Sequence, residues 1–196
     1  MIDIHFTANA VLRHRTPDQI LGPFFPLKRA HTGQCDLTAI GGANGVAQGE
    51  VIEVRGRVLN CNGDPVPGAD LTIWQANALG RYMHPADANP SPLDPNFAGS
   101  TDIRSDEDGG YRIRTVKPGA YPAGTDWMRP PHIHFEVQGK FERLITQMYF
   151  PDDPLNARDR LLNSALRPDL LVATLVWQPD EAQHRVLNFD IVLSRG

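Results

Sequence analysis

Residues 51–59 (VIEVRGRVL) indicate the fold class, because apolar and polar side chains alternate from Ile52 to Val58. Successive side chains of a β-strand point to opposite faces, so this alternation predicts a strand with one buried face. The turn sequence NGD follows at 62–64, and residues 69–75 then predict a second strand. The chain therefore begins its core with two consecutive strands and no helix between them.

Short strand-like segments recur along the rest of the chain. They lie at 111–116, 132–137, 143–150, 171–178 and 186–193. The chain holds 17 glycines and 17 prolines, which interrupt helices, and only residues 152–166 have the apolar spacing of a longer helix. We therefore predict a mainly β protein, a single-domain β-sandwich of about seven or eight strands with little helix. Residues 1–50 are expected to form an arm and loop that pack on the sandwich of residues 51–196.

Three segments lack a strand pattern. Residues 77–99 and 119–131 are rich in proline and glycine, so we expect long ordered loops, a kind of segment that often carries functional residues. Residues 16–21 are expected to form a capped helical turn, with Thr16 as the N-cap and Pro17 at the first helical position.

The net charge and the hydropathy argue against nucleic-acid and membrane partners. The formal net charge is −4, whereas nucleic-acid binders are usually basic. No apolar stretch approaches the roughly 20 residues that a membrane helix needs. The N-terminal residues lack the pattern of a signal peptide, and Cys35 and Cys61 form no disulfide framework. We therefore expect a cytoplasmic protein.

The segment His132-Ile133-His134 is a candidate metal site. Side chains two positions apart in a strand share a face, so both imidazoles project together while Ile133 points into the core. The preceding prolines at 130 and 131 restrict the entry to this strand. A carboxylate such as Glu136 could complete a ferrous or zinc site. The loop tyrosines Tyr82 and Tyr121 are the stronger candidates for further ligands.

Several motifs resemble the intradiol ring-cleavage dioxygenases, most closely the iron-binding subunit of the protocatechuate 3,4-dioxygenase branch. The resemblance extends from about residue 16 to the last strand. The motifs are LGPFFP at 21–26, WQANALGRYMH at 74–84, PLDPNF at 92–97, TVKPGAYP at 115–122 and WMRPPHIHF at 127–135.

This resemblance implies a mononuclear, non-haem Fe(III) enzyme that uses O₂ as co-substrate. It implies that both oxygen atoms enter a catechol-type diol and that the ring opens between the two hydroxyl-bearing carbons, giving a muconate-type dicarboxylate. The implied iron ligands are Tyr82, Tyr121, His132 and His134.

The resemblance also implies roles for other residues. Tyr121 is the ligand expected to leave when substrate binds, and Arg129 is expected to stabilise negative charge on the substrate. Gln147 is expected near the reacting ring, and Trp127 in the pocket wall.

Two departures from the family pattern concern the substrate and the assembly. Tyr121-Pro122 is followed by Ala123-Gly124, where the protocatechuate branch of the family has an aromatic and a basic residue, so these small residues are expected to widen the substrate pocket. The substrate is then protocatechuate-like or another substituted catechol, with hydroxyquinol or gallate-type diols as alternatives. Residues 149–159 resemble the subunit without iron as much as the subunit with it, so we expect one chain to form a homo-oligomer.

A non-catalytic alternative rests on residues 54–69, which resemble transthyretin-like β-sandwich binding modules. Fold alone does not separate a binding module from an enzyme. The joint presence of both loop tyrosines, the paired histidines and Arg129 favours the enzyme.

Overall fold

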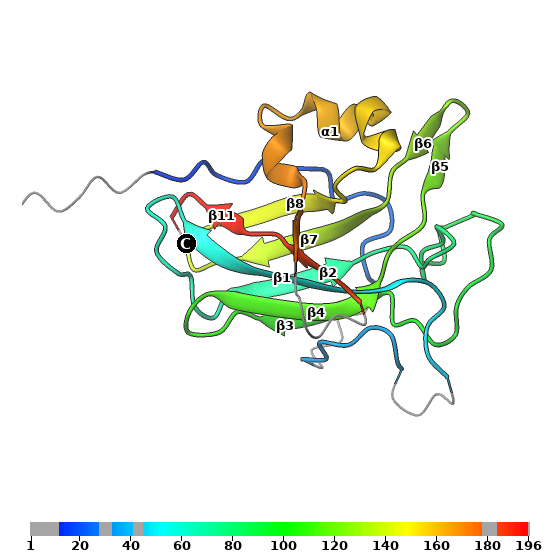
Figure 1. The fold of residues 1–196 in the computed structure, drawn as a ribbon, viewed down its shortest axis with the longest axis horizontal. Coiled ribbons are helices and arrows are strands. Elements are labelled where there is room, and N and C mark those ends of the chain that lie inside the picture. Colours follow the sequence, from blue (N-terminus) through cyan, green and yellow to red (C-terminus); the bar gives the residue numbers. More distant parts are fainter. Residues whose placement is uncertain (1–11, 28–32, 41–44, 178–183, 196) are drawn as a thin grey trace, which may run out of the picture.

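The structure is a computed structural model that describes residues 12–27, 33–40, 45–177 and 184–195. These residues form two main sheets and a separate hairpin, with short helices only (Figure 1). The strands are β1 (Val51–Asn60), β2 (Asp70–Trp74), β3 (Ser100–Arg104), β4 (Gly110–Val116), β5 (Tyr121–Gly124), β6 (Trp127–Arg129), β7 (His132–Gln138), β8 (Arg143–Tyr149), β9 (Thr174–Val176), β10 (Arg185–Asn188) and β11 (Ile191–Leu193). The helices are η1 (Pro154–Arg158), α1 (Arg160–Ser164) and η2 (Pro168–Leu171).

The two sheets form a sandwich, which confirms the predicted fold class. One sheet has the order β11-β1-β10-β9, with β4 also paired to β1, and the other has the order β3-β2-β7-β8. β1 receives β10 and β11 in parallel along successive parts of its length. The chain crosses between these two pairings beside Gly56, where a Cβ atom would lie 2.0 Å from the carbonyl oxygen of Phe189.

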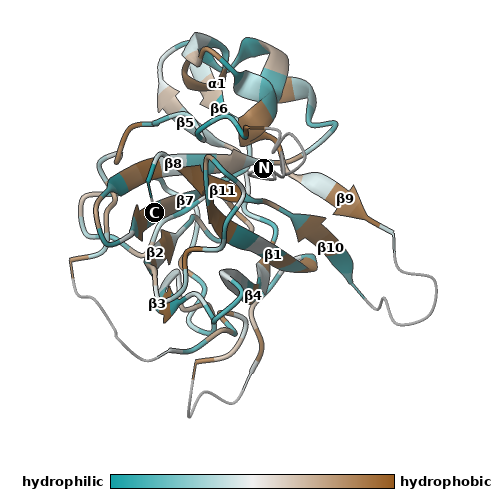
Figure 2. Cartoon of the chain, turned by 90° about the vertical axis from the view of Figure 1, so that its left-hand side faces the viewer, coloured by the Kyte–Doolittle hydropathy of each residue, from teal (hydrophilic) through white to brown (hydrophobic). Residues whose placement is uncertain are grey.

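The core lies between the two sheets and follows the alternation seen in the sequence. Ile52 and Val54 of β1 belong to the same buried cluster as Leu71 and Ile73 of β2 and Ile133 of β7. Figure 2 shows hydrophobic residues on these strands, with hydrophilic residues between them. Burying each such side chain contributes roughly 1.5–3 kcal/mol, so the core holds the sheets face to face.

Three expectations about single elements are wrong, and one strand was not predicted. Residues 119–131 hold the hairpin β5–β6 and are not all loop, because Tyr121 pairs with Arg129 across a short ladder. β3 was not expected, and the described chain has eleven strands. The predicted helix at 152–166 breaks into η1 and α1, because Asp153 and Asp159 each cap a new start. The predicted strand at 186–193 is interrupted between β10 and β11.

Residues 12–27 contain no helix, so the predicted capped turn at 16–21 is also wrong. The Thr16 hydroxyl accepts a hydrogen bond from the N–H of Val192 (2.9 Å), and the Thr16 N–H donates to the Val192 carbonyl (3.0 Å). Farther along, the N–H of Gln19 donates to the carbonyl of Ile145 (2.8 Å). The segment therefore connects β11 of one sheet to β8 of the other and leads Gly22 toward β7.

Glu142, in the turn between β7 and β8, ties this segment to the end of β11. Its carboxylate accepts hydrogen bonds from the Arg15 side chain (2.5 Å) and the backbone N–H of Ser194 (2.6 Å). Burial raises the pKa of this carboxyl, but these hydrogen bonds and the charge of Arg15 outweigh burial and hold the pKa below its usual value. Such a group stabilises the fold above its unfolded pKa, and the contribution is lost as the pH falls through the folded pKa.

We expect Glu142→Gln to lower the free energy of unfolding by about 1–2 kcal/mol near neutral pH, because charged hydrogen bonds are lost. The two proteins should converge as the pH falls below about 4, where the wild-type carboxyl is protonated. Urea unfolding followed by circular dichroism at both pH values measures this. Glu107→Gln, at an exposed position, is the matched control. An equal difference at both pH values would contradict the linkage.

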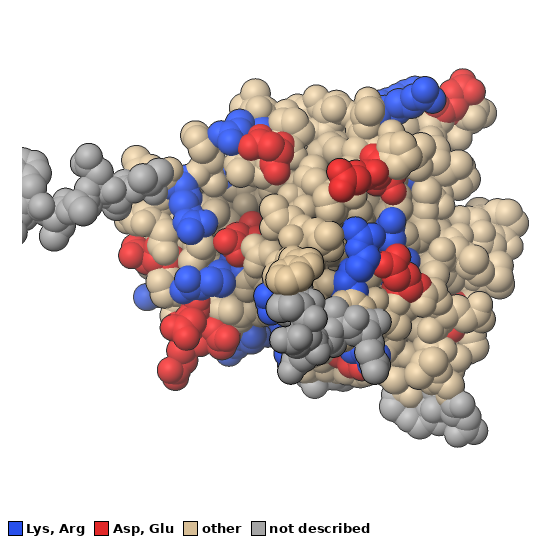
Figure 3. Space-filling model, viewed as in Figure 1, with Lys and Arg blue, Asp and Glu red and all other residues tan. Residues whose placement is uncertain are grey.

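The surface face seen in Figure 3 carries basic and acidic residues interspersed, without a large field of one sign. Within the described residues, no helix has the length and apolar character needed to cross a membrane.

Candidate active site

His132 and His134 project from the outer face of the β3-β2-β7-β8 sheet, while Ile133 between them is fully buried in the core. The strand register fixes their neighbours. His134 lies opposite Trp74 on β2 and opposite Gln147 on β8. The Trp74 and His134 rings stack with centroids 4.7 Å apart. Cross-strand neighbours on one face of a sheet are in direct contact, so the imidazoles have little freedom to turn.

The two loop tyrosines reach the same point from other elements. Tyr82 lies in the long loop after β2, and Tyr121 is the first residue of β5. The Tyr82 Oη atom lies 3.1 Å from His134 Nε2 and 3.4 Å from His132 Nε2. The Tyr121 Oη atom lies 3.4 Å from His132 Nε2, and the two Nε2 atoms are 3.2 Å apart. Four potential ligand atoms therefore converge on one small volume.

This donor set fits a single metal ion. Ligands bound at about 2.0–2.1 Å to one ion are roughly 3 Å from each other, as these four atoms are. His132 Nδ1 lies 2.7 Å from the carbonyl oxygen of Pro130 and donates to it, which leaves the lone pair of Nε2 facing the cluster. Phenol oxygen is a hard donor once ionised, and imidazole suits iron. Hard anionic oxygen ligands favour the ferric state.

Burial sets the protonation of these four groups. Burial, followed by the positive charge of Arg129, lowers the pKa of His132 to about 3. The pKa of His134 is lowered well below its usual value by burial, then by His132 and Arg129. Burial raises the pKa of both Tyr82 and Tyr121. The imidazoles are therefore neutral and able to bind a metal ion. The phenols ionise readily only when a bound cation offsets the free-energy cost of a buried negative charge.

Glycine allows the two tyrosine-bearing segments to approach each other. Gly80 has a φ of +79°, and a Cβ atom there would lie 2.4 Å from the carbonyl oxygen of Ala120. Gly119 is packed against the same backbone, with its own Cβ position 2.5 Å from the Gly80 nitrogen. This contact brings the Tyr82 and Tyr121 rings edge to face with centroids 5.4 Å apart.

Gly80→Ala is therefore expected to lower the free energy of unfolding by about 3 kcal/mol, because it combines backbone strain with a steric clash. The matched control is Gly68→Ala, since Gly68 also has a positive φ of +69° but nothing lies within 4 Å of its Cβ position. We expect this control to cost only about 1 kcal/mol. Thermal unfolding measures both. Equal losses would show that the Ala120 contact is unimportant.

A cavity of about 530 Å³ opens beside the cluster. Tyr121, Arg129 and His134 line it, whereas Tyr82 and His132 do not. Its other walls are mainly apolar and come from residues 20–24, residues 86–90 and the β5–β6 hairpin. Of the predicted pocket residues, Ala123 and Trp127 line this cavity. Gly124 does not line it, and nothing lies within 4 Å of its Cβ position.

Arg129 is held by a buried network that sequence reasoning did not predict in full. Its Nε donates to Asp159 (2.8 Å), and its Nη2 donates to Gln147 Oε1 (2.7 Å) and to Tyr149 Oη (2.9 Å). Asp159 has no exposed surface and also caps α1 by accepting from the N–H of Leu162 (2.7 Å). Gln147 thus contacts Arg129 directly. Asp159 was missed, although an Asp before the short apolar run LL is a helix-cap signal.

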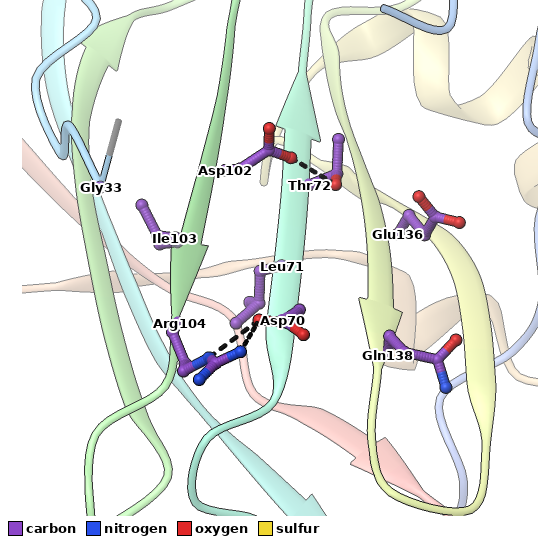
Figure 4. A pocket seen from close by; sticks show the side chains of 9 residues that line it. All are labelled: Gly33, Asp70, Leu71, Thr72, Asp102, Ile103, Arg104, Glu136 and Gln138. Carbon is purple, nitrogen blue, oxygen red and sulfur yellow. Dashed lines mark hydrogen bonds and ion pairs between the residues drawn. The ribbon is translucent and has the colours of Figure 1, made fainter. Parts of the chain in front are cut away.

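The carboxylate alternative for the metal site is not formed in the described residues. They contain no group of three His, Cys, Asp or Glu side chains arranged to hold a metal. Glu136 instead pairs with Arg143. It lies farther along the same sheet face and lines a separate cavity of about 480 Å³ (Figure 4). There Thr72 donates to Asp102 and Arg104 pairs with Asp70, and none of the described histidines or tyrosines lines that cavity.

The fold and the donor cluster together define a class, a β-sandwich protein with imidazole and phenol donors beside a largely apolar cavity. Comparison with known proteins identifies the family. The family model described as dioxygenase matches residues 20–195. The chain belongs to the intradiol ring-cleavage dioxygenases, as its motifs predicted. Membership of an enzyme family sets aside the non-catalytic binding-module alternative.

Individual relatives show the range of the family. The chain is 45% identical over 166 residues to the beta chain of protocatechuate 3,4-dioxygenase from Burkholderia cepacia, which covers 81% of this chain and 70% of that one. It is 31% identical over 162 residues to hydroxyquinol 1,2-dioxygenase from a Rhizobium species, covering 73% of this chain and 52% of the relative. The present chain therefore spans about half the length of the hydroxyquinol relative.

The fold of the chain is also similar to that of a solved dioxygenase structure. The dioxygenase domain of a dioxygenase and carbohydrate-binding fusion protein from Streptomyces sp. SirexAA-E superposes with a TM-score of 0.71 at 28% identity. The match covers 93% of this chain and 100% of that domain. Members of this family are generally non-haem Fe(III) enzymes.

Proposed function

We propose that this chain binds one Fe(III) ion and uses O₂ to open an aromatic ortho-diol between its two hydroxyl-bearing carbons. The product is a muconate-type dicarboxylic acid. Both atoms of O₂ end in the two new carboxyl groups, so the reaction balances without an external reductant. The substrate is protocatechuate-like, another substituted catechol or a hydroxyquinol-type diol, the classes that the names of the relatives contain.

The observation that carries the proposal is the convergence of Tyr82, Tyr121, His132 and His134, in which four pairs of donor atoms lie 3.1–3.4 Å apart. These residues would hold the ion. Bound Fe(III) would act as a Lewis acid that lowers the pKa of the diol hydroxyls and makes the ring reactive toward O₂. Proton transfer and the stabilisation of negative charge are assigned to the side chains.

Tyr121 is the ligand best placed to exchange for substrate. It lines the cavity and its side chain retains some exposure, whereas Tyr82 is 2% exposed and does not line the cavity. When the diol enters, the Tyr121 oxygen is within reach to accept one hydroxyl proton as a general base. Tyr82, whose backbone N–H is fixed by Asp87 (2.7 Å), stays in place.

Arg129 supplies a fixed positive charge at the diol end of the cavity. Its position is set by its pairing opposite Tyr121 in the hairpin and by the bond to Gln147. A guanidinium that is already oriented stabilises negative charge that develops on the substrate without reorganising during the reaction. Gln147 and Asp159 act by positioning this group.

The proposal is tested with the iron-loaded chain, isotopically labelled O₂ and a panel of catechol, protocatechuate and hydroxyquinol. We expect a red-brown protein with a tyrosinate-to-iron absorption band, O₂ uptake with at least one diol, and label in both carboxyl groups of the product. A colourless protein with full iron content would contradict the ligand set. Ring opening beside the diol, which gives an aldehyde product, would contradict the reaction.

We also propose that one chain supplies the whole donor set and functions as a homo-oligomer in the cytoplasm. The support is that all four donors come from a single chain. Gel filtration with light scattering on the purified chain tests the assembly. A monomer, or activity that requires a second kind of subunit, would contradict it.

A further inference from the structure

We infer that this site selects ortho-diols that carry an uncharged, apolar ring substituent and disfavours those that carry a carboxylate. The inference rests on the proposed function, because it concerns the cavity beside the proposed iron site. It narrows the substrate class that the names of the relatives leave open. Three features of the cavity support the inference. They are its apolar walls, the placement of its charges and the exposed position of Ala123 on the β5–β6 hairpin.

The walls of this cavity are mainly apolar. They include Ile20, Pro23, Ala86, Pro90, Ala123 and Trp127. The cavity volume of about 530 Å³ exceeds what a single aromatic ring fills, since pockets of this size hold drug-sized ligands. A ring whose two hydroxyls lie beside His134 and Tyr121 therefore leaves room in the cavity for a substituent. The apolar surface around that space favours an apolar substituent.

The charges of the cavity do not suit a second anion. Among its described lining residues, Arg129 and Asp87 are the ones with a formal charge. Arg129 lies at the diol end and is already paired with Asp159. Asp87 is an acid, and its carboxylate accepts from the N–H groups of Tyr82 and Asn89. Arg160 stacks on the ring of Trp127 and does not line the cavity.

A ring carboxylate would therefore lose its hydration without gaining a cationic partner from the described lining. Burying an unpaired carboxylate is strongly unfavourable, and a nearby acid adds repulsion. A methyl or larger alkyl group at the same ring position meets no such penalty and gains contact with the apolar walls. The cavity thus discriminates by charge more than by size.

Ala123 is the position at which this selectivity can be reversed. It lines the cavity, yet its small side chain is exposed on the hairpin, so a longer side chain has room to extend. An arginine there would place a flexible cation at the mouth of the cavity, near a bound ring substituent. Ala123→Met adds comparable length without charge and is the matched control.

The test compares kcat/KM for 4-methylcatechol and protocatechuate, using the iron-loaded chain and O₂ uptake. We expect a preference for 4-methylcatechol of about 100-fold, because the carboxylate loses hydration that the cavity replaces only in part. Ala123→Arg should reduce that preference by about 10-fold, and Ala123→Met, which adds no charge, should not reduce it. Protocatechuate used as well as or better than 4-methylcatechol would overturn the inference while leaving the proposed function intact.

Binding measurements separate the inference from the proposed function. Calorimetric titration of the iron-loaded protein with 4-methylphenol and 4-hydroxybenzoate, which lack the second hydroxyl, measures selectivity without turnover. We expect the methylphenol to bind more tightly, by a factor that Ala123→Arg reduces. If no diol is turned over but this order of binding holds, the proposed reaction is wrong and the cavity preference stands. Tighter binding of 4-hydroxybenzoate overturns the inference.

Discussion

Replacing His132 with alanine is expected to leave a folded protein that does not retain iron and has no measurable ring-opening activity. His132 is at the centre of the donor cluster, because its Nε2 lies within 3.4 Å of both tyrosine oxygens and 3.2 Å from His134 Nε2. Removing it takes away a ligand atom that neighbours all three others. We expect kcat to fall by more than about 1,000-fold, since the Lewis acid is lost with the ligand.

Iron content by elemental analysis, the visible absorption band and circular dichroism check this result together. His14→Ala is the control, because His14 is an exposed histidine outside the cluster. It should keep iron, colour and activity. A His132→Ala protein that binds iron stoichiometrically and keeps the wild-type absorption band would contradict the proposed ligand set. Added imidazole that restores part of the iron binding would support it.

Asp159→Asn is expected to have the second largest effect. The Arg129–Asp159 pair has side-chain exposures of 4% and 0%, so the neutral variant leaves a buried guanidinium without its counter-ion. Breaking a buried pair in this way typically costs about 3–5 kcal/mol. For a chain of this size the melting temperature should fall by about 10 °C. Asparagine still caps α1, so the loss reports mainly on the charge.

The same substitution should lower kcat by about 100-fold with a smaller change in KM, because the Arg129 guanidinium is no longer held toward the diol end of the cavity. A purely structural role for Asp159 would lower stability without this kinetic split. The matched control is Asp169→Asn, which removes the acid of an exposed pair with Arg167. Exposed pairs contribute about 0–1 kcal/mol, so that variant should unfold and turn over like the wild type.

The sheet half of the site was predictable from the sequence because it depends on local alternation. The spacing of His132, Ile133 and His134 determines which side chains face outward, whatever the rest of the chain does. The same reasoning holds for Leu71 and Ile73 in the core. The sandwich follows from many such short segments. The proposed roles of the four donors came from the resemblance to a family, and they remain predictions about metal binding.

The parts that sequence reasoning missed depend on contacts between distant segments. Threonine is a residue type that often caps helices, but the Thr16 hydroxyl instead accepts a hydrogen bond from the N–H of Val192, which lies far along the chain. The hairpin β5–β6 is too short and too rich in proline and glycine to show alternation. Asp159 lies 30 positions from Arg129, and only the packing of α1 over the end of the sheet brings them together.

The hairpin β5–β6 carries both a proposed metal ligand and part of the cavity wall. Its first residue is Tyr121, the phenol expected to leave for substrate, and Ala123 and Trp127 in the cavity wall are on the same two strands. In the described chain, β5 and β6 are paired only with each other. A bulky ring substituent that displaces this wall therefore also displaces Tyr121, the ligand expected to leave. Sequence drift in the hairpin should change ring preference and turnover together, while the histidine pair on β7 keeps its geometry.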